Sequence, residues 1–381
     1  MANVLTDLAA DIYKSADVIG RELVGFIPAC TINSDSSEQA AKGDTVRSHF
    51  THSATVGDQT PAMTIPEGTD QTVDSKTLTL DKSRGVQIPW TGEDIKHVNN
   101  GSGFETVYGD QVLQAMRALV NEIEADLAQA AYQSASRAVG TAGTTPFGSN
   151  FNDVAKVRQV LVDNGMPSND GRASLILNSA AGTNLRNLAQ LQKANEAGGD
   201  QMLRQGVLLD LQGLALRESA QVKTHTKGSA SGRLANSASL AIGDTSIAFD
   251  TGSGAFNAGD VVTFNGDANN YVVKADASAT PLVINGPGLR TAVADNSAIT
   301  VGNNFTANVA MHQAALELAM RAPAVPPGGD AASERLVVQD DHSGLIFDIA
   351  VYKGFQKMMI NVSATWGKKA WKDEYIAILM G

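Results

Sequence analysis

Two short clusters bring together residue types that could bind a metal ion or transfer a proton. His49 and His52 lie three positions apart in a strand-like segment, which points their side chains to opposite faces rather than towards one ion. The run from Asp340 to Gly344 (Asp-Asp-His-Ser-Gly) places an acid, a base and a hydroxyl side by side. Catalytic triads assemble from distant positions, so we predict solvated histidines for the first cluster and a turn before a strand for the second.

A third cluster consists of Glu122, Glu124 and Asp126. On a helix Glu122 and Asp126 share a face while Glu124 points elsewhere, which favours a solvated helix face over a divalent-ion site. Cys30 is the single cysteine, so the chain can form no internal disulfide and no thiolate metal cluster. No residue beside Cys30 would activate a thiolate, and we predict that it is a small buried hydrophobic residue.

Nucleic-acid binding is only weakly indicated by the sequence. The basic and aromatic run from Lys368 to Lys372 is followed at once by Asp373 and Glu374, which favours a solvated turn. With 29 Lys and Arg against 40 Asp and Glu, the net charge of −11 argues against tight wrapping of DNA but not against enclosing it. Neither a phosphate-binding glycine loop nor a nucleophile elbow is present. We therefore expect a structural protein, with no enzyme activity, cofactor or metal.

The composition predicts a globular chain large enough for two or more packed units. The chain has 381 residues, of which 43% are hydrophobic and 18% are charged. Its first residues lack a basic segment followed by an apolar run, so we expect no secretory signal. No stretch approaches ~18 uninterrupted apolar residues, and we expect no membrane span.

The first 90 residues have little apolar material with which to form a core of their own. An apolar stripe from Leu5 to Phe26 predicts a helix that Pro28 ends and that must dock on the body or on another chain. The polar run from Asn33 to Glu38 predicts a loop. From Thr45 to Trp90, alternating segments predict a long two-stranded excursion, which would be stable mainly when something else covers it.

A long helix and a mixed α/β unit follow. Apolar residues recur every three or four positions from Phe104 to Gly140, which predicts a helix of roughly 50 Å. Between Asn152 and Leu216 the patterns predict helices over residues 152–163 and 178–191, with a buried strand over 173–177 and further strand towards residue 216.

The composition changes again at Lys223. From there to Asn303 the chain has no Glu and no Trp, and four short apolar strands are separated by turn-rich stretches. This spacing predicts a small all-β barrel or sandwich inserted into the mixed unit. Afterwards, alternating strands over residues 345–351 and 358–366 and a final segment over 375–379 predict an antiparallel set.

The order of these parts resembles the major capsid fold of tailed phages, the Hong Kong 97 type. Within that family, the β insertion is similar to that of the short-tailed Salmonella-phage coat proteins. The segment from Asn308 to Ala319, followed by Pro323 and Pro326, is similar to the family's segment after the insertion. The run from Asp341 to Leu345 and the later Trp366-Gly367 resemble its Ser-Gly-Leu … Tyr-Gly ending, with Trp in place of the usual Tyr. The opening Ala2-Asn3-Val4-Leu5-Thr6 is also typical of the family.

The resemblance implies an α+β fold and a role in a virion capsid assembled in the host bacterial cytoplasm. It implies hexamers and pentamers of this chain that form an icosahedral shell around double-stranded DNA, without sequence-specific binding or a membrane. Scaffolding and portal proteins are the implied partners, with a decoration protein as a further one. The implied divisions are an N-terminal arm (1–44), an extended loop (45–92), a peripheral domain with the spine helix (93–150), an axial domain (151–222), the insertion (223–303) and returning strands (304–381).

Within this scheme, we expect the excursion to lie over the long helix of an adjacent subunit. The candidate inter-subunit contacts are Phe26, Arg47, Phe50, Lys76, Lys82, Arg84 and Trp90. Covalent cross-linking stays open, and Lys76 or Lys82 could in principle supply an amine for it. Two alternatives stay open as well: a cargo-carrying nanocompartment shell with the same fold, and a β-rich tail or adhesin component.

Overall fold

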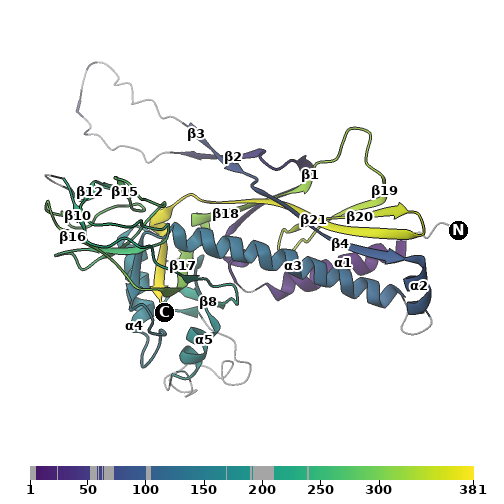
Figure 1. The fold of residues 1–381 in the computed structure, drawn as a ribbon, viewed down its shortest axis with the longest axis horizontal. Coiled ribbons are helices and arrows are strands. Elements are labelled where there is room, and N and C mark those ends of the chain that lie inside the picture. The colour runs from purple at the N-terminus through teal and green to yellow at the C-terminus, as the bar shows by residue number, and fades with distance from the viewer. Residues whose placement is uncertain are drawn as a thin grey trace.

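The computed structural model describes residues 6–23, 25–51, 58, 60–61, 63, 73–99, 104–168, 170–188, 191, 210–237 and 240–381. Within these ranges the chain forms an elongated molecule built on two large sheets and one long helix (Figure 1). No helix in the described part of the chain is long and apolar enough to cross a membrane.

The N-terminal arm consists of helix α1 (Thr6–Glu22), a 3-10 turn η1 (Ile27–Ala29) and strand β1 (Thr31–Ala40). Helix α1 ends at Glu22 and not at Pro28, so the predicted single helix is too long. The predicted loop over residues 33–38 is wrong, because β1 pairs in parallel with strand β18 (Leu316–Pro323). The pairing register shifts between Asp35 and Gln39, so the polar residues between them form a bulge in the strand.

The predicted excursion is shorter than the sequence suggests. Strands β2 (Thr45–Thr51) and β3 (Val73–Thr79) pair with each other and form a hairpin that extends away from the body (Figure 1). Strand β4 (Lys82–Thr91) belongs to the body, where it pairs along its length with strand β21 (Lys357–Ala370). The last part of the alternation that predicted the excursion, from Val86 to Trp90, therefore comes from a strand of the central sheet.

Helix α3 (Phe104–Gln133), the long spine of the molecule, follows the short helix α2 (Gly92–Asn99). It ends seven residues before Gly140, because the Ser136 backbone N–H and hydroxyl both donate to the carbonyl of Ile376, at 2.9 and 2.8 Å. The chain then enters strand β5 (Arg137–Gly140), which runs parallel to the C-terminal strand β22 (Ile376–Met380). The sequence therefore predicted the long helix correctly but not its end.

The central sheet has the order β1-β18-β21-β20-β19, with β4 paired to β21. Strands β20 (Ile346–Gly354) and β21 confirm the two predicted alternating strands, and β19 (Ala332–Gln339) was not predicted. One face of this sheet packs on α3 and α1, and Trp366, Ile349 and Val362 are buried there. This layer of sheet on helix is the largest core of the molecule.

The second sheet joins the mixed unit to the insertion. Helix α4 (Asn152–Asp163) and strand β6 (Ala173–Leu177) have the predicted bounds, while helix α5 (Ser179–Arg186) is shorter than predicted. The remaining strands of the mixed unit are β7 (Asp210–Leu211), β8 (Leu214–Glu218) and β17 (Phe305–His312). The insertion contributes β9 (Thr224–His225), β10 (Arg233–Ala235), β11 (Ser246–Ile247), β12 (Phe249–Asp250), β13 (Val261–Phe264), β14 (Asn270–Val272), β15 (Leu282–Val283) and β16 (Ala298–Val301).

The insertion has its own core of short-strand side chains, as the sequence predicted. It is nevertheless not a separate barrel, because β14 pairs with β5 and continues the sheet of the body. Asn285 strengthens this junction by donating to the carbonyls of Gln133 and Ala135, each at 2.8 Å.

Candidate subunit interface

The β2–β3 hairpin is the feature of the fold that has least support from its own chain. Its root rests on a small cluster of Ala40, Leu78, Leu80 and Ala319. Beyond this root the two strands pair only with each other, from Thr45 opposite Thr79 to Thr51 opposite Val73. An isolated two-stranded ribbon is marginal in water, so a second surface is needed to cover it.

Gly367 on β21 allows the hairpin to cross the central sheet at close range. A Cβ atom at this position would lie 2.2 Å from the Thr79 carbonyl oxygen and 2.9 Å from the Leu80 Cα. Both are backbone atoms, which cannot move aside as a side chain would. Lys369, two residues farther along β21, donates from its Nζ to the carbonyl of Thr77 at 2.8 Å. This hydrogen bond also holds the hairpin at the crossing point.

Trp371 forms the aromatic part of the hairpin root. The ammonium groups of Lys369 and Lys76 lie 4.6 and 5.6 Å from its ring centre, and its indole N–H donates to the Glu317 carboxylate. Such cation–π contacts contribute about 0.5–1 kcal/mol each at exposed sites. The predicted solvated turn at Lys368 and Lys369 is wrong, because both residues lie in β21 and face the hairpin and its neighbours.

Lys82 and Arg84, two of the candidate contact residues, converge on the acidic cluster of α3. The Lys82 Nζ lies 2.8 Å from Asp126 and 3.2 Å from Glu122, and the Arg84 Nε lies 3.2 Å from Glu122. The Trp366 indole donates to the second oxygen of Asp126 at 3.1 Å. Asp126 is thus a buried partner of the sheet, and the predicted solvated face is wrong at this position.

The ion pairs also settle the state of the Lys82 amine. Burial disfavours its charge, but the hydrogen bonds that the ammonium donates to Asp126 and Glu122, with the charges of these carboxylates, outweigh burial and raise the pKa of Lys82. The amine is therefore protonated at neutral pH and is a poor nucleophile. In this arrangement Lys82 fastens β4 to α3 and is not poised for covalent cross-linking.

Glu124, the third member of the cluster, holds the N-terminal arm. Its carboxylate accepts the backbone N–H groups of Phe26 and Ile27 at 2.5 and 3.0 Å, and the hydroxyl of Ser219 at 2.9 Å. Burial raises the pKa of Glu124, against the effect of these hydrogen bonds. The predicted solvated position is wrong here too, because η1 and the chain near Ser219 cover the side chain.

The other candidate contact residues fall into two groups. Phe26 is fully buried, and Trp90 is buried with its indole donating to Gln111 at 2.9 Å, so both lie inside the subunit. Arg47 is exposed on β2 and Lys76 is partly exposed on β3, both in the hairpin. Phe50 lies on β2, but its side chain, like that of His49 and the whole of His52, is outside the described residues.

The remaining chemical clusters are structural. The Asp340 carboxylate accepts a hydrogen bond from the Ser343 N–H at 2.7 Å, and the Asp340 carbonyl accepts one from the Gly344 N–H at 2.8 Å. These bonds confirm the predicted turn. Cys30 is confirmed as a buried residue, its thiol donates to the carbonyl of Ile27 at 3.1 Å, and burial raises its pKa. In the part of the chain that the structure describes, no three His, Cys, Asp or Glu side chains gather as a metal site.

Four features together define a class of fold. They are the arm, the projecting hairpin, the spine helix packed under a sheet, and the second sheet with its insertion. This is the fold of tailed-phage major capsid proteins, the Hong Kong 97 type, and the predicted α+β class is confirmed.

Comparisons with known proteins find similar solved structures at low sequence identity. No family model and no curated protein matches the chain. A solved chain from the capsid of cyanophage P-SCSP1u is 11% identical, with a TM-score of 0.50, and the match covers 94% of this chain and 88% of that one. A chain from Mycobacterium phage Che8 is 14% identical, with a TM-score of 0.48 and coverage of 94% and 91%. A virus-like particle from Pyrococcus furiosus is 9% identical, with a TM-score of 0.43 and coverage of 97% and 98%.

Proposed function

We propose that this chain is the major capsid protein of a tailed phage, a structural and non-enzymatic protein. In this proposal hexamers and pentamers of the chain form an icosahedral shell around the double-stranded DNA genome. The fold supports the proposal, since the solved chain that resembles it comes from a phage capsid. The observation that carries it is the β2–β3 hairpin, which projects from the body with almost no core of its own.

In the proposed shell the hairpin lies over the spine helix α3 of an adjacent subunit. Arg47 and Lys76 are then the contact residues of the candidate set that the hairpin presents, while Lys82 and Arg84 fix the adjoining strand to the subunit's own helix. The Gly367 crossing and the Trp371 cluster set the direction in which the hairpin leaves the body. A fixed direction lowers the entropy that each subunit loses when it joins its neighbour.

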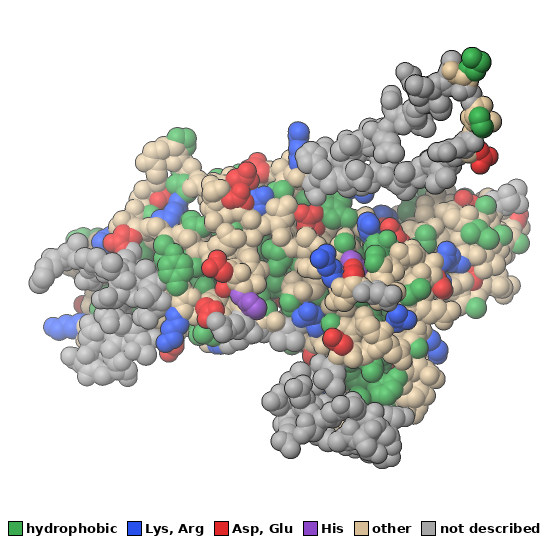
Figure 2. All heavy atoms as spheres, turned by 180° about the vertical axis from the view of Figure 1, so that it is seen from behind, with side chains coloured by type: hydrophobic (Ala, Val, Ile, Leu, Met, Phe, Trp, Pro, Cys, Tyr) green, Lys and Arg blue, Asp and Glu red, His purple; other side chains and the backbone are tan. Residues whose placement is uncertain are grey.

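The charge distribution suits a container for DNA. The chain has a net charge of −11, and Figure 2 shows acidic and basic side chains interspersed over one face, with no broad basic patch among the coloured residues. Tight non-specific DNA binding needs a continuous basic surface that releases counterions. We therefore propose that the shell encloses DNA without sequence-specific contacts.

The proposal includes partners that a closed shell of this type requires. A scaffolding protein would guide assembly, a portal protein would occupy one vertex, and a decoration protein is a further partner. The chain would assemble in the host bacterial cytoplasm and remain in the virion capsid.

Electron microscopy of the purified full chain, alone and co-expressed with its neighbouring genes, tests the proposed function. We expect closed shells of uniform size in at least one of the two conditions. Shells that hold a peptide-tagged cargo protein and no DNA would instead favour a nanocompartment. Discrete monomers or trimers in both conditions would overturn the proposal.

A further inference from the structure

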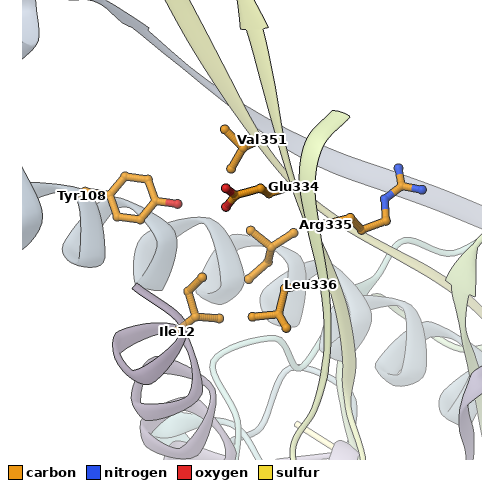
Figure 3. A pocket seen from close by; sticks show the side chains of 7 residues that line it. Ile12, Tyr108, Glu334, Arg335, Leu336 and Val351 are labelled. Carbon is orange, nitrogen blue, oxygen red and sulfur yellow. The ribbon is translucent and has the colours of Figure 1, made fainter. Parts of the chain in front are cut away.

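A cavity of about 270 Å³ lies between α1, the beginning of α3 and strands β19 and β20 (Figure 3). Ile12, Tyr108, Leu336, Ile349 and Val351 give it an almost continuous apolar wall. Leu336 and Glu334 are partly exposed, so the cavity opens to the surface beside β19. A cavity of about 150 Å³ is enough to hold a benzene ring, so this one has room for an aromatic side chain.

The cavity also contains one unsatisfied charged group. The carboxylate of Glu334 faces the Tyr108 hydroxyl, while the Arg335 guanidinium points away (Figure 3). No donor among the described residues reaches the buried Oε2 of Glu334. Burial, together with the charge of Glu334, raises the pKa of Tyr108 to about 12, so the phenol stays neutral. A buried carboxylate oxygen without a partner is costly, which indicates that a cationic group from elsewhere completes the site.

The same end of the molecule carries an aromatic side chain with nothing to cover it. Phe355, in the turn between β20 and β21, is 88% exposed. Lys353 and Lys357 flank it, both exposed, and neither forms an ion pair within the described part of the chain. The turn is held in place, because Gly354 pairs with Lys357 and the carbonyl of Gln356 accepts the Gly92 N–H at 3.0 Å.

A subunit cannot place this Phe355 in its own cavity. Val351 lines the cavity, and Phe355 lies four residues farther along the chain, in the turn after β20 ends at Gly354, which is at most about 13 Å at 3.3 Å per residue. Phe355 of the same subunit therefore does not fill the cavity, and a second copy of the chain can supply the ring. A contact between two different patches of identical subunits can close a ring of subunits.

We propose that Phe355 of one subunit inserts into this cavity of a second copy of the chain, and that Lys353 or Lys357 beside it pairs with Glu334. The apolar wall receives the ring, and the lysine supplies the cation that the buried carboxylate lacks. This inference rests on the proposed function, because the two copies are neighbours in the assembled shell.

Cross-linking in assembled shells tests this contact. The variants Glu334→Cys with Lys353→Cys and Glu334→Cys with Lys357→Cys keep Phe355, and the native Cys30 is buried. Treatment with a short bis-maleimide should link subunits into a ladder on a denaturing gel, and each single variant should give none. Adding Phe355→Ala should lower the cross-linked fraction at least five-fold or prevent assembly of folded subunits, whereas Phe355→Leu should retain most of it.

The outcomes separate the contact from the function. Shells that form normally but give no cross-link with either pair, or that cross-link equally with Phe355→Ala, would overturn the contact while the proposed function stands. A small apolar molecule or a segment of the same chain in the cavity would produce this result. If the unmodified chain forms no shells in any condition, the proposed function itself fails.

Discussion

At the scale of single residues, the carboxylates of α3 illustrate how burial assigns different roles to similar side chains. Glu122 is the outermost, and it pairs with Lys82 and Arg84. Asp126 joins the helix to β21 through the Trp366 indole, and Glu124 binds the backbone of the arm. The sequence predicts a solvated helix face with Glu124 pointing away from Glu122 and Asp126. It does not show the partners of these groups, because they come from segments about 40 to 240 residues away.

Glu124 makes the attachment of the arm depend on pH. Its pKa in the folded chain is raised above the ordinary value of 4.5, so its contribution to stability is greatest below pH 4.5 and falls as pH rises through the raised pKa. We expect the free energy of unfolding of the native chain, minus that of Glu124→Gln, to decrease between about pH 4.5 and neutrality. Denaturant titrations of both proteins across this range give the difference, and a difference that grows with pH would contradict the assignment.

Gly367 is expected to be intolerant of any side chain. In Gly367→Ala the new Cβ meets the Thr79 carbonyl and the Leu80 backbone, and overpacking of this kind costs about 1–3 kcal/mol. We expect a lower free energy of unfolding and faster proteolysis within the hairpin.

Gly354→Ala is the matched control for this substitution. Its Cβ would lie no closer than 3.6 Å to a neighbour, and Gly354 is likewise in a strand of the central sheet, at the end of β20. Equal stability of the two variants would show that the hairpin does not depend on the close crossing.

At the scale of elements, the sequence predicts best where local pattern and tertiary role coincide. Helix α4 and strand β6 have the predicted bounds, because their apolar periodicity is the face that they bury. The polar β1 was missed, since a strand paired in parallel at the edge with a bulge needs no alternation. The end of α3 was missed because Ser136 is bound by Ile376, 240 residues away, which no local signal records.

The insertion has enough core to be tested as an element. Phe256 and Tyr271 are fully buried within it. Its links to the body include the β14–β5 and β9–β17 strand pairs, the Asn285 side chain and the Lys274–Asp373 ion pair. We expect residues 223–303 expressed alone to give a dispersed amide spectrum. Phe256→Ala removes a fully buried ring, which costs about 3–5 kcal/mol of stability. We expect this variant of the fragment to lose the dispersion of its amide spectrum. A collapsed spectrum for the unmodified fragment would mean that the insertion depends on its contacts with the body for its fold.

At the scale of the whole molecule, the hairpin and the Phe355 turn extend from opposite parts of an elongated body (Figure 1). Both offer surface that the subunit itself leaves uncovered. The candidate contacts taken from the sequence stay a prediction for the excursion, and they mix exposed residues such as Arg47 with core residues such as Phe26. Residue types and spacing cannot distinguish exposed residues from core residues. Burial depends on pairing with strands that come from the far end of the chain.

Removal of the hairpin tip is expected to separate folding from assembly. Deletion of Asp58 to Gln71 leaves the root residues Leu78 and Leu80 in place, so we expect folded subunits with an unchanged midpoint of denaturation that do not form shells. A Gly/Ser segment of the same length in this position is the control for loss of length alone. Normal shells from the deletion variant, seen by electron microscopy, would exclude a covering role for the hairpin.

The junction at Asn285 has a mechanical consequence. The carbonyls that this side chain binds lie at the C-terminal end of α3, where a helix has no partners of its own for such groups. The insertion is therefore coupled to the spine both through a shared sheet and through the end of the helix axis. We expect a load applied to the insertion to reach α3 directly, because its strand pair and the Asn285 side chain both attach it where this helix ends.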